Sequence, residues 1–136
     1  MSVRVFRGSE NILIKSLSRI LFAVSALILA LGAEIHYMAF HRVAFALAKS
    51  DLPEFFGKGF KVLWLQDSVL QIIFAIVFAV LAVRPSAAPR WVVFMVAFLL
   101  LSTVALVYSI IGNFIAGHLF LAAALAAILG AVLKPD

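Results

Sequence analysis

The side chains best suited to chemistry in this chain stand inside long stretches of apolar sequence. Glu34 and Asp67 are carboxylates, and the histidines and tyrosine at similar positions within their own segments are His41, His118 and Tyr108. A carboxylate in an apolar setting is a natural acid or base, because removal from water makes its charged form costly. We expect Asp67 to act as a base or charge stabiliser and Glu34 as an acid. His118 and Tyr108 would serve as proton donors.

Helical spacing places several of these groups on shared faces. Glu34, Tyr37 and His41 are three and four residues apart, so they share one face at about 100° per residue. His36 lies about 160° away from Glu34 on the same helix, and we expect it to have a structural or interfacial role. A second polar face repeats the spacing; its members are Trp64, Asp67, Ser68 and Gln71.

These faces predict one polar pocket, because two polar faces at the same membrane depth avoid lipid by facing each other. The expected lining comprises Glu34, His41, Asp67, Gln71, Tyr108 and His118. Ser68 and Asn113 are further candidate ligand contacts, and Trp64 is a candidate that is more typical of an interface anchor. The simpler interpretation is that these groups hydrogen-bond only to one another and set the helix register.

The composition identifies the elements that must position these groups. The chain has 136 residues, of which 66% are hydrophobic and 12% charged, and its mean hydropathy is +1.21. A soluble domain carries about a quarter of its residues as charged side chains, so the chain is predicted to be an integral membrane protein. The absence of cysteine excludes disulfides and thiolate metal sites.

Four stretches are long enough to cross the bilayer, since a crossing needs about 20 apolar residues. They cover residues 20–41, 62–83, 91–111 and 114–133. The chain is therefore predicted to be a single all-α domain, residues 1–136, folded as a bundle of four transmembrane helices. Residues 20–33 could instead be the apolar part of a cleavable signal peptide, but the basic segment before them is longer than such leaders usually carry.

The basic residues predict the topology. The net charge of +5 is better explained by membrane orientation than by a nucleic-acid partner, because no polar face is available to bind nucleic acid. One side would hold Arg4, Arg7, Lys15, Arg19, Arg84, Arg90 and Lys134, and the other would hold Arg42, Lys49, Lys58 and Lys61. This distribution predicts cytoplasmic termini in an inner (plasma) membrane, with the polar pocket toward the periplasmic or extracellular side.

The connections between spans also carry signals. Pro85 and Pro89 are expected to end the second span and begin the third. Gly112 and Asn113 predict a tight turn, which makes the last two helices antiparallel neighbours. Interfacial segments are expected before the first span and in the loop 42–61, where Ser50 or Asp51 would cap a short helix.

Several functions fit this arrangement. The first is binding or acid–base conversion, as in an isomerase, of an apolar or lipid-like small molecule that arrives through the bilayer. The second is a transition-metal or b-type haem site, with His41, His118 and Glu34 as candidate ligands. A third possibility is an accessory subunit whose polar residues only set packing.

The chain is also similar, in size and helix count, to the small multidrug-resistance exporters, which have an acidic residue in the first span. That resemblance implies a proton-coupled transporter working as a homo-oligomer. Glu34 stands toward the end of its span rather than near the middle, and a second acid, Asp67, lies in the next span. No residue is carried across from that family.

Overall fold

The computed structural model describes residues 3–134, with side chains from residue 12 onward, and in this part of the chain it is entirely helical. The helices are α1 (Val3–Ala48), α2 (Glu54–Val83), the 3-10 helix η1 (Pro85–Ala87), α3 (Arg90–Ile110) and α4 (Ile115–Leu133). All four α-helices are long and apolar enough to cross a membrane. The prediction of an all-helical protein with four spans is confirmed, and the four helices indicate a multi-pass membrane protein.

The segments expected to be interfacial are instead parts of long helices. α1 continues without a break through Arg19 and to Ala48, and α2 already begins at Glu54, so most of the predicted loop 42–61 is helical. Hydropathy marks where a helix leaves lipid and not where it ends, and no glycine or proline interrupts residues 42–48. The predicted loop 42–61 is therefore too long, whereas the interfacial position of the two segments stays a prediction. The side chains of Arg4 and Arg7, which entered the topology prediction, lie outside the described residues.

The predicted cap of the second helix is also wrong. The N-cap of α2 is Pro53, without a side-chain hydrogen bond to the helix. Ser50 belongs to the end of α1, where its Oγ donates to the carbonyl oxygen of Leu47 at 2.8 Å. Proline suits this helix start because a first-turn amide would have no partner inside the helix.

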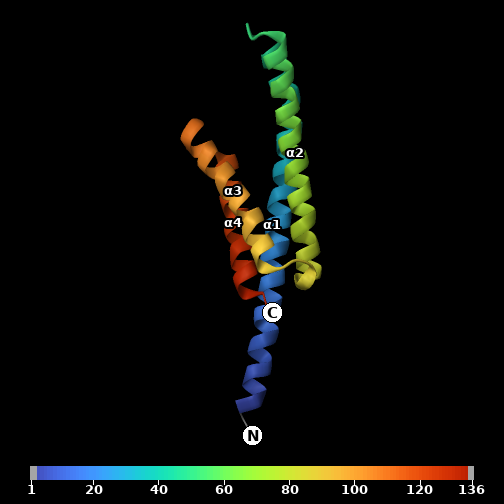
Figure 1. Ribbon diagram of the computed structural model, residues 1–136, viewed down its shortest axis with the longest axis vertical. Helices are drawn as coiled ribbons and strands as arrows, with labels where there is room; N and C mark the ends of the chain where they lie inside the picture. The colour runs from blue at the N-terminus through green and yellow to red at the C-terminus, as the bar shows by residue number, and fades with distance from the viewer. Residues whose placement is uncertain (1–2, 135–136) are drawn as a thin grey trace.

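The two helical hairpins differ in length. At 1.5 Å per residue, the 46 residues of α1 extend about 69 Å and the 30 residues of α2 about 45 Å. The 21 residues of α3 extend about 31 Å, close to the roughly 30 Å of bilayer hydrocarbon. The α1–α2 hairpin consequently extends well beyond the α3–α4 hairpin at the end where each hairpin turns (Figure 1).

The connections before and after α3 confirm the roles predicted for their proline and glycine residues. Pro85 opens η1, and Pro89 directly precedes α3. The Arg90 guanidinium donates to the backbone oxygen of Lys134, and the Lys134 ammonium donates to that of Ala88, which ties the start of α3 to the end of α4. At the other end Gly112 has φ +88°, a left-handed conformation that glycine adopts without strain.

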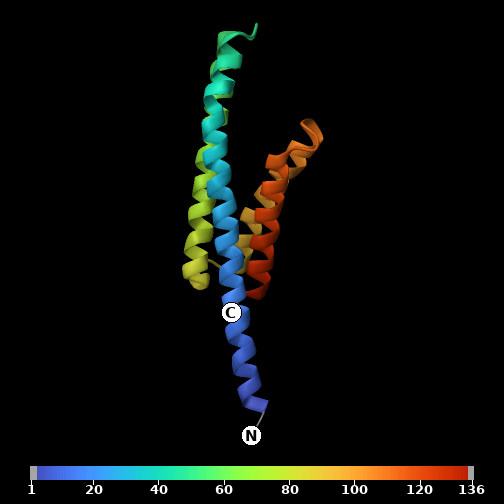
Figure 2. The same cartoon turned by 180° about the vertical axis from the view of Figure 1, so that it is seen from behind.

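All four helices contribute to a common core in the half of the molecule near η1. α1 packs against both α2 and α4, and α3 packs mainly against α4. The largest core side chains are Phe22, Leu29, Phe78, Leu81 and Leu100. Toward the α3–α4 turn, the α3–α4 hairpin diverges from α1 and α2, as both views show (Figures 1 and 2). The predicted bundle is therefore closed at one end and open at the other.

Serines and small residues set the contact between α1 and α4. Ser18 Oγ donates to the Gly130 carbonyl oxygen at 2.7 Å, and Ser25 Oγ donates to that of Ala123 at 2.9 Å, both buried. Between them Phe22 lies so near Gly130 that a Cβ there would be 3.0 Å from the phenylalanine ring. Small residues allow this close approach, which is a common way for helices to associate in membranes.

Candidate functional site

The polar residues fall into two clusters and a separate groove, and not into the single pocket expected from the sequence. The α1–α2 cluster consists of His36, Trp64, Asp67, Ser68 and Gln71. The α3–α4 cluster consists of Tyr108, Asn113 and His118. Glu34 and His41 belong to neither cluster.

His36 connects the polar groups of the α1–α2 cluster. Its Nδ1 is 2.9 Å from Ser68 Oγ, and its Nε2 is 3.6 Å from Asp67 Oδ2. Gln71 Nε2 donates to the same Asp67 oxygen at 2.6 Å. The result is a chain of contacts that runs from a hydroxyl through an imidazole to a carboxylate.

Packing holds the imidazole in place. The Trp64 ring stacks on the His36 ring with centroids 4.1 Å apart and planes 10° apart, and Trp64 Nε1 donates to the His36 backbone oxygen at 2.9 Å. Ser68 and Gln71 are only 3% and 4% exposed. Gln71 fits because Gly32 faces it, since a Cβ there would be 2.8 Å from Gln71 Oε1. The predicted polar face of the second span is confirmed as a shared face, and Trp64 does more than anchor the interface.

His36 is the functional candidate that sequence reasoning missed. His36 lies off the face of Glu34 and His41, as its spacing predicts, but it contacts the polar face of α2 because it continues the buried stripe of α1 formed by Ser18, Phe22, Ser25 and Leu29. His36 is seven residues after Leu29, which returns it to within about 20° of the same face. The signal in the sequence is the spacing of the small and apolar residues 18, 22, 25 and 29, which continues to His36. The spacing of the charged residues does not include it.

The α3–α4 cluster is built over the tight turn. The Tyr108 hydroxyl is 2.6 Å from His118 Nδ1, and His118 Nε2 is 2.7 Å from Asn113 Oδ1. Gly117 provides the space for the tyrosine ring, because a Cβ there would be 2.5 Å from Tyr108 Cε1. With Gly112, the cluster lines an open hollow of about 340 Å³. The structure brings these three residues together but separates them from Glu34 and Asp67, with which the sequence analysis had grouped them.

Glu34 and His41 are exposed on α1 and form no hydrogen bond or ion pair with any described residue. The prediction that they share a pocket with Asp67 and His118 is wrong, because α1 is rotated so that its serine and glycine face packs inward. Among the described residues, no group of three or more His, Cys, Asp or Glu is arranged to hold a metal ion. The candidate ligands His41, His118 and Glu34 are thus not assembled by this fold.

A crevice of about 190 Å³ lies where the two hairpins diverge. One wall is formed by α1 and α2 and includes His36, Trp64 and Gln71, together with apolar residues. The opposite wall is entirely apolar and comprises Phe114, Ile115, Ala116, Leu119 and Phe120. The crevice is therefore almost entirely apolar, and the lining residues that carry polar groups all belong to one wall.

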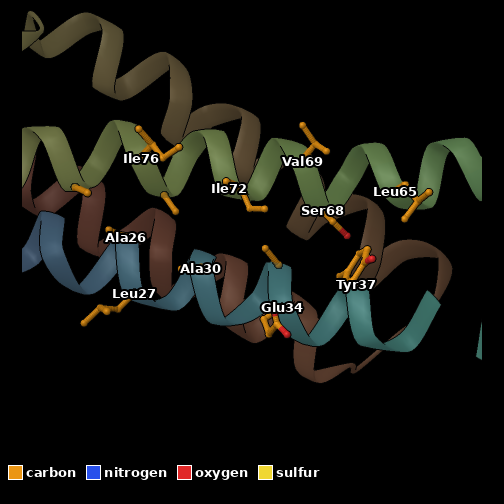
Figure 3. A pocket seen from close by; sticks show the side chains of 13 residues that line it. Ala26, Leu27, Ala30, Glu34, Tyr37, Leu65, Ser68, Val69, Ile72 and Ile76 are labelled. Carbon is orange, nitrogen blue, oxygen red and sulfur yellow. The ribbon is translucent and has the colours of Figure 1, made fainter. Parts of the chain in front are cut away.

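A larger groove of about 840 Å³ runs along α1 and α2. Its alanine-rich lining includes Ala26, Ala30 and Ala79, and Glu34, Tyr37 and Ser68 lie toward one end (Figure 3). Ser68 thus lines this groove while its hydroxyl contacts His36, which lines the crevice.

Comparison with known proteins returns no match: no family model, curated protein or solved structure resembles the chain.

Proposed function

We propose that the protein binds a lipid-soluble small molecule with one polar end in the crevice between the α1–α2 hairpin and α4. The observation that carries the proposal is the almost entirely apolar lining of the crevice, in which the residues with polar groups, His36 and Gln71, stand on one wall only. Binding sites for small molecules commonly combine an apolar lining with a few polar groups that fix orientation. His36 and Gln71 contact Ser68 and Asp67, so the polar end of the ligand would bind the imidazole or the amide in exchange for one of these contacts.

The size of the crevice suits a ring or a short chain. Its volume of about 190 Å³ exceeds the roughly 150 Å³ of an engineered apolar cavity that binds benzene. The hairpins diverge toward the α3–α4 turn (Figure 2), so a larger ligand could extend from the crevice into the bilayer. A phenol, a quinone or a hydroxylated isoprenoid has the required combination of an apolar body and a polar end.

Acid–base conversion of such a ligand is the second candidate function. It is favoured by the contacts of His36 with both Ser68 and Asp67, which place a hydroxyl, an imidazole and a carboxylate next to one another. In this scheme His36 transfers the proton and Asp67 stabilises the charge. The proposed acid Glu34 and the proposed donors Tyr108 and His118 lie elsewhere, and their catalytic roles stay predictions.

We further infer an inner (plasma) membrane location with the crevice toward the periplasmic or extracellular side. Support comes from Arg19, Arg84, Arg90 and Lys134, which all stand at the η1 end of the spans. An excess of basic residues is typical of the cytoplasmic side. The crevice lies in the opposite half, and both ends of the described chain would then be cytoplasmic.

The geometry gives less support to a transporter or to a haem protein. Transport needs access from both sides of the membrane, and the half near η1 is filled by large side chains such as Phe22, Phe78 and Leu100. A haem held by His41 and His118 would need a free nitrogen on each imidazole, whereas both nitrogens of His118 contact Tyr108 and Asn113. The packed inner half is one more reason to favour a ligand that enters laterally from lipid.

The binding proposal can be tested with tryptophan fluorescence. Trp64 lines the crevice and Trp91 starts α3 at the other end, so Trp91→Phe leaves Trp64 as the reporter. We expect 4-decylphenol, added to proteoliposomes, to change the Trp64 emission saturably, and decylbenzene to have at least tenfold weaker effect because it lacks a polar end.

Two variants make the test specific. His36→Phe keeps a ring stacked on Trp64 but removes its hydrogen bonds, and it should weaken phenol binding about tenfold, the usual cost of one lost polar contact. His118→Phe, in the other cluster, should leave binding unchanged. Equal responses to phenol and hydrocarbon, or equal losses in both variants, would contradict the proposal.

A further inference from the structure

We propose that the groove on α1 and α2 docks a second copy of this chain, giving a parallel homodimer in which Tyr37 of one copy donates a hydrogen bond to the Glu34 carboxylate of the other. The proposal rests on the shape of the groove, on the unsatisfied carboxylate at its edge and on the position of the tyrosine one turn away. It is independent of the ligand proposed for the crevice.

The groove has the form of a helix-docking surface. Its volume of about 840 Å³ is created by small side chains, with Ala26, Ala30 and Ala33 on α1 opposite Ala75 and Ala79 on α2. Figure 3 shows the larger side chains, such as Leu27 and Ile76, at its edges. In membranes, where lipid and protein surfaces are equally apolar, helices associate where small residues let backbones approach.

Glu34 needs a partner that its own chain does not provide. It lies within the apolar span of α1, between Arg19 and Arg42, and is exposed. No described residue forms a hydrogen bond or ion pair with it. A carboxylate facing lipid at this depth costs several kcal/mol, so a hydrogen-bond donor on a neighbouring molecule would remove a large penalty.

A second copy supplies that donor by symmetry. Both copies insert with the same orientation, so their two-fold axis runs along the membrane normal and the same faces meet. Tyr37 is three residues after Glu34 on the same face and also lines the groove. The two residues differ in height by about 4.5 Å, which a tyrosine side chain spans, and its hydroxyl has no hydrogen-bond partner among the described residues. Each copy therefore offers one acceptor and one donor.

Disulfide cross-linking tests the geometry cleanly, because the chain contains no cysteine. We expect Leu27→Cys and Ala30→Cys, introduced singly at the groove, to form dimers on mild oxidation in native membranes. The matched control is Leu99→Cys, an exposed position within the span of α3, which should remain monomeric. Cross-linking at the groove positions no stronger than at the control would overturn the proposal.

The hydrogen bond is tested separately by Tyr37→Phe. Loss of two interhelical hydrogen bonds per dimer should raise the dimer dissociation constant roughly 5- to 10-fold, measured by energy transfer in lipid vesicles at varied protein density. Ile110→Val, at an exposed position on α3, serves as the control and should leave the constant unchanged. An unchanged constant for Tyr37→Phe, or a monomer that carries a bound lipid in native mass spectrometry at all protein densities, would contradict the dimer.

Discussion

The two histidine clusters share a pattern and differ in what surrounds it. In each, Nδ1 of the histidine contacts a hydroxyl, Ser68 for His36 and Tyr108 for His118, at 2.9 and 2.6 Å. In each, Nε2 faces a side-chain oxygen. That oxygen is the Asp67 carboxylate in the α1–α2 cluster, at 3.6 Å, and the Asn113 amide in the α3–α4 cluster, at 2.7 Å.

The Nε2 partners differ in charge, because Asp67 is a carboxylate and Asn113 is a neutral amide. Both ring nitrogens of His118 have a hydrogen-bond partner, the Tyr108 hydroxyl and the Asn113 oxygen. Both ring nitrogens of His36 also have polar neighbours, but these belong to the other helix of its hairpin. The α3–α4 cluster therefore fastens a turn, whereas the α1–α2 cluster joins two long helices.

The clusters also differ in how they are assembled. Tyr108 and His118 are ten residues apart across a tight turn, so local structure brings them together. His36 and Ser68 are 32 residues apart on two long helices, and only helix packing makes them meet. Replacements in the α1–α2 cluster should therefore disturb tertiary structure more.

The largest expected effect is that of His36→Ala. It removes the stacking on Trp64 and leaves the buried Ser68 hydroxyl without its partner, so the free energy of unfolding should fall by about 2–3 kcal/mol. His118→Ala, at an exposed histidine, should cost about 1 kcal/mol or less. Reversible unfolding in mixed micelles measures both, and equal losses would remove the distinction between the clusters.

An intermediate effect is expected for Gly117→Ala. The new Cβ would be 2.5 Å from the rigid Tyr108 ring, which must move and thereby lose His118. We expect a loss of about 1–2 kcal/mol in the free energy of unfolding, typical of overpacking. Gly57→Ala in α2, where nothing lies within 4 Å, is the control and should be neutral or stabilising. A stabilising Gly117→Ala would show that the tyrosine does not need this space.

The smallest effect is expected for Gly32→Ala. Its Cβ would meet Oε1 at the flexible end of Gln71, at 2.8 Å, so the amide can swing away and release Asp67. The lost hydrogen bond and the gain in helix propensity nearly offset each other, leaving a net change under about 1 kcal/mol. Phenol binding should nevertheless weaken, because Gln71 lines the crevice. Unchanged stability together with unchanged binding would exclude Gln71 from the site.

Much of the fold could be predicted because hydrophobic length alone decides it. The third and fourth spans agree with α3 and α4 to within one residue at each end, and Pro89 and Gly112 mark their boundaries as expected. The ends of α1 and the start of α2 could not be predicted in the same way, since helices continue into water wherever no residue stops them. The end of an apolar stretch shows where side chains suit water, whereas the end of a helix depends on residues that interrupt its backbone hydrogen bonds.

Half of the site could be predicted for a similar reason. Trp64, Asp67, Ser68 and Gln71 share a face by spacing alone, and α2 presents that face to α1. The face that α1 presents in return was predicted from Glu34 and His41, on the premise that charged groups turn away from lipid. Packing of Ser18, Phe22 and Ser25 against α4 sets the rotation of α1 instead, and this rotation brings His36 inward.

The amino-acid order by itself determined four apolar helices, their turns and the polar residues of α2, because each follows from local composition and spacing. Only the tertiary structure decided which histidine meets which carboxylate and where the hairpins separate. The physical reason is that rotation of a helix about its axis leaves its own hydrogen bonds unchanged, so the choice is made by the close packing of serine, glycine and alanine against a neighbouring helix.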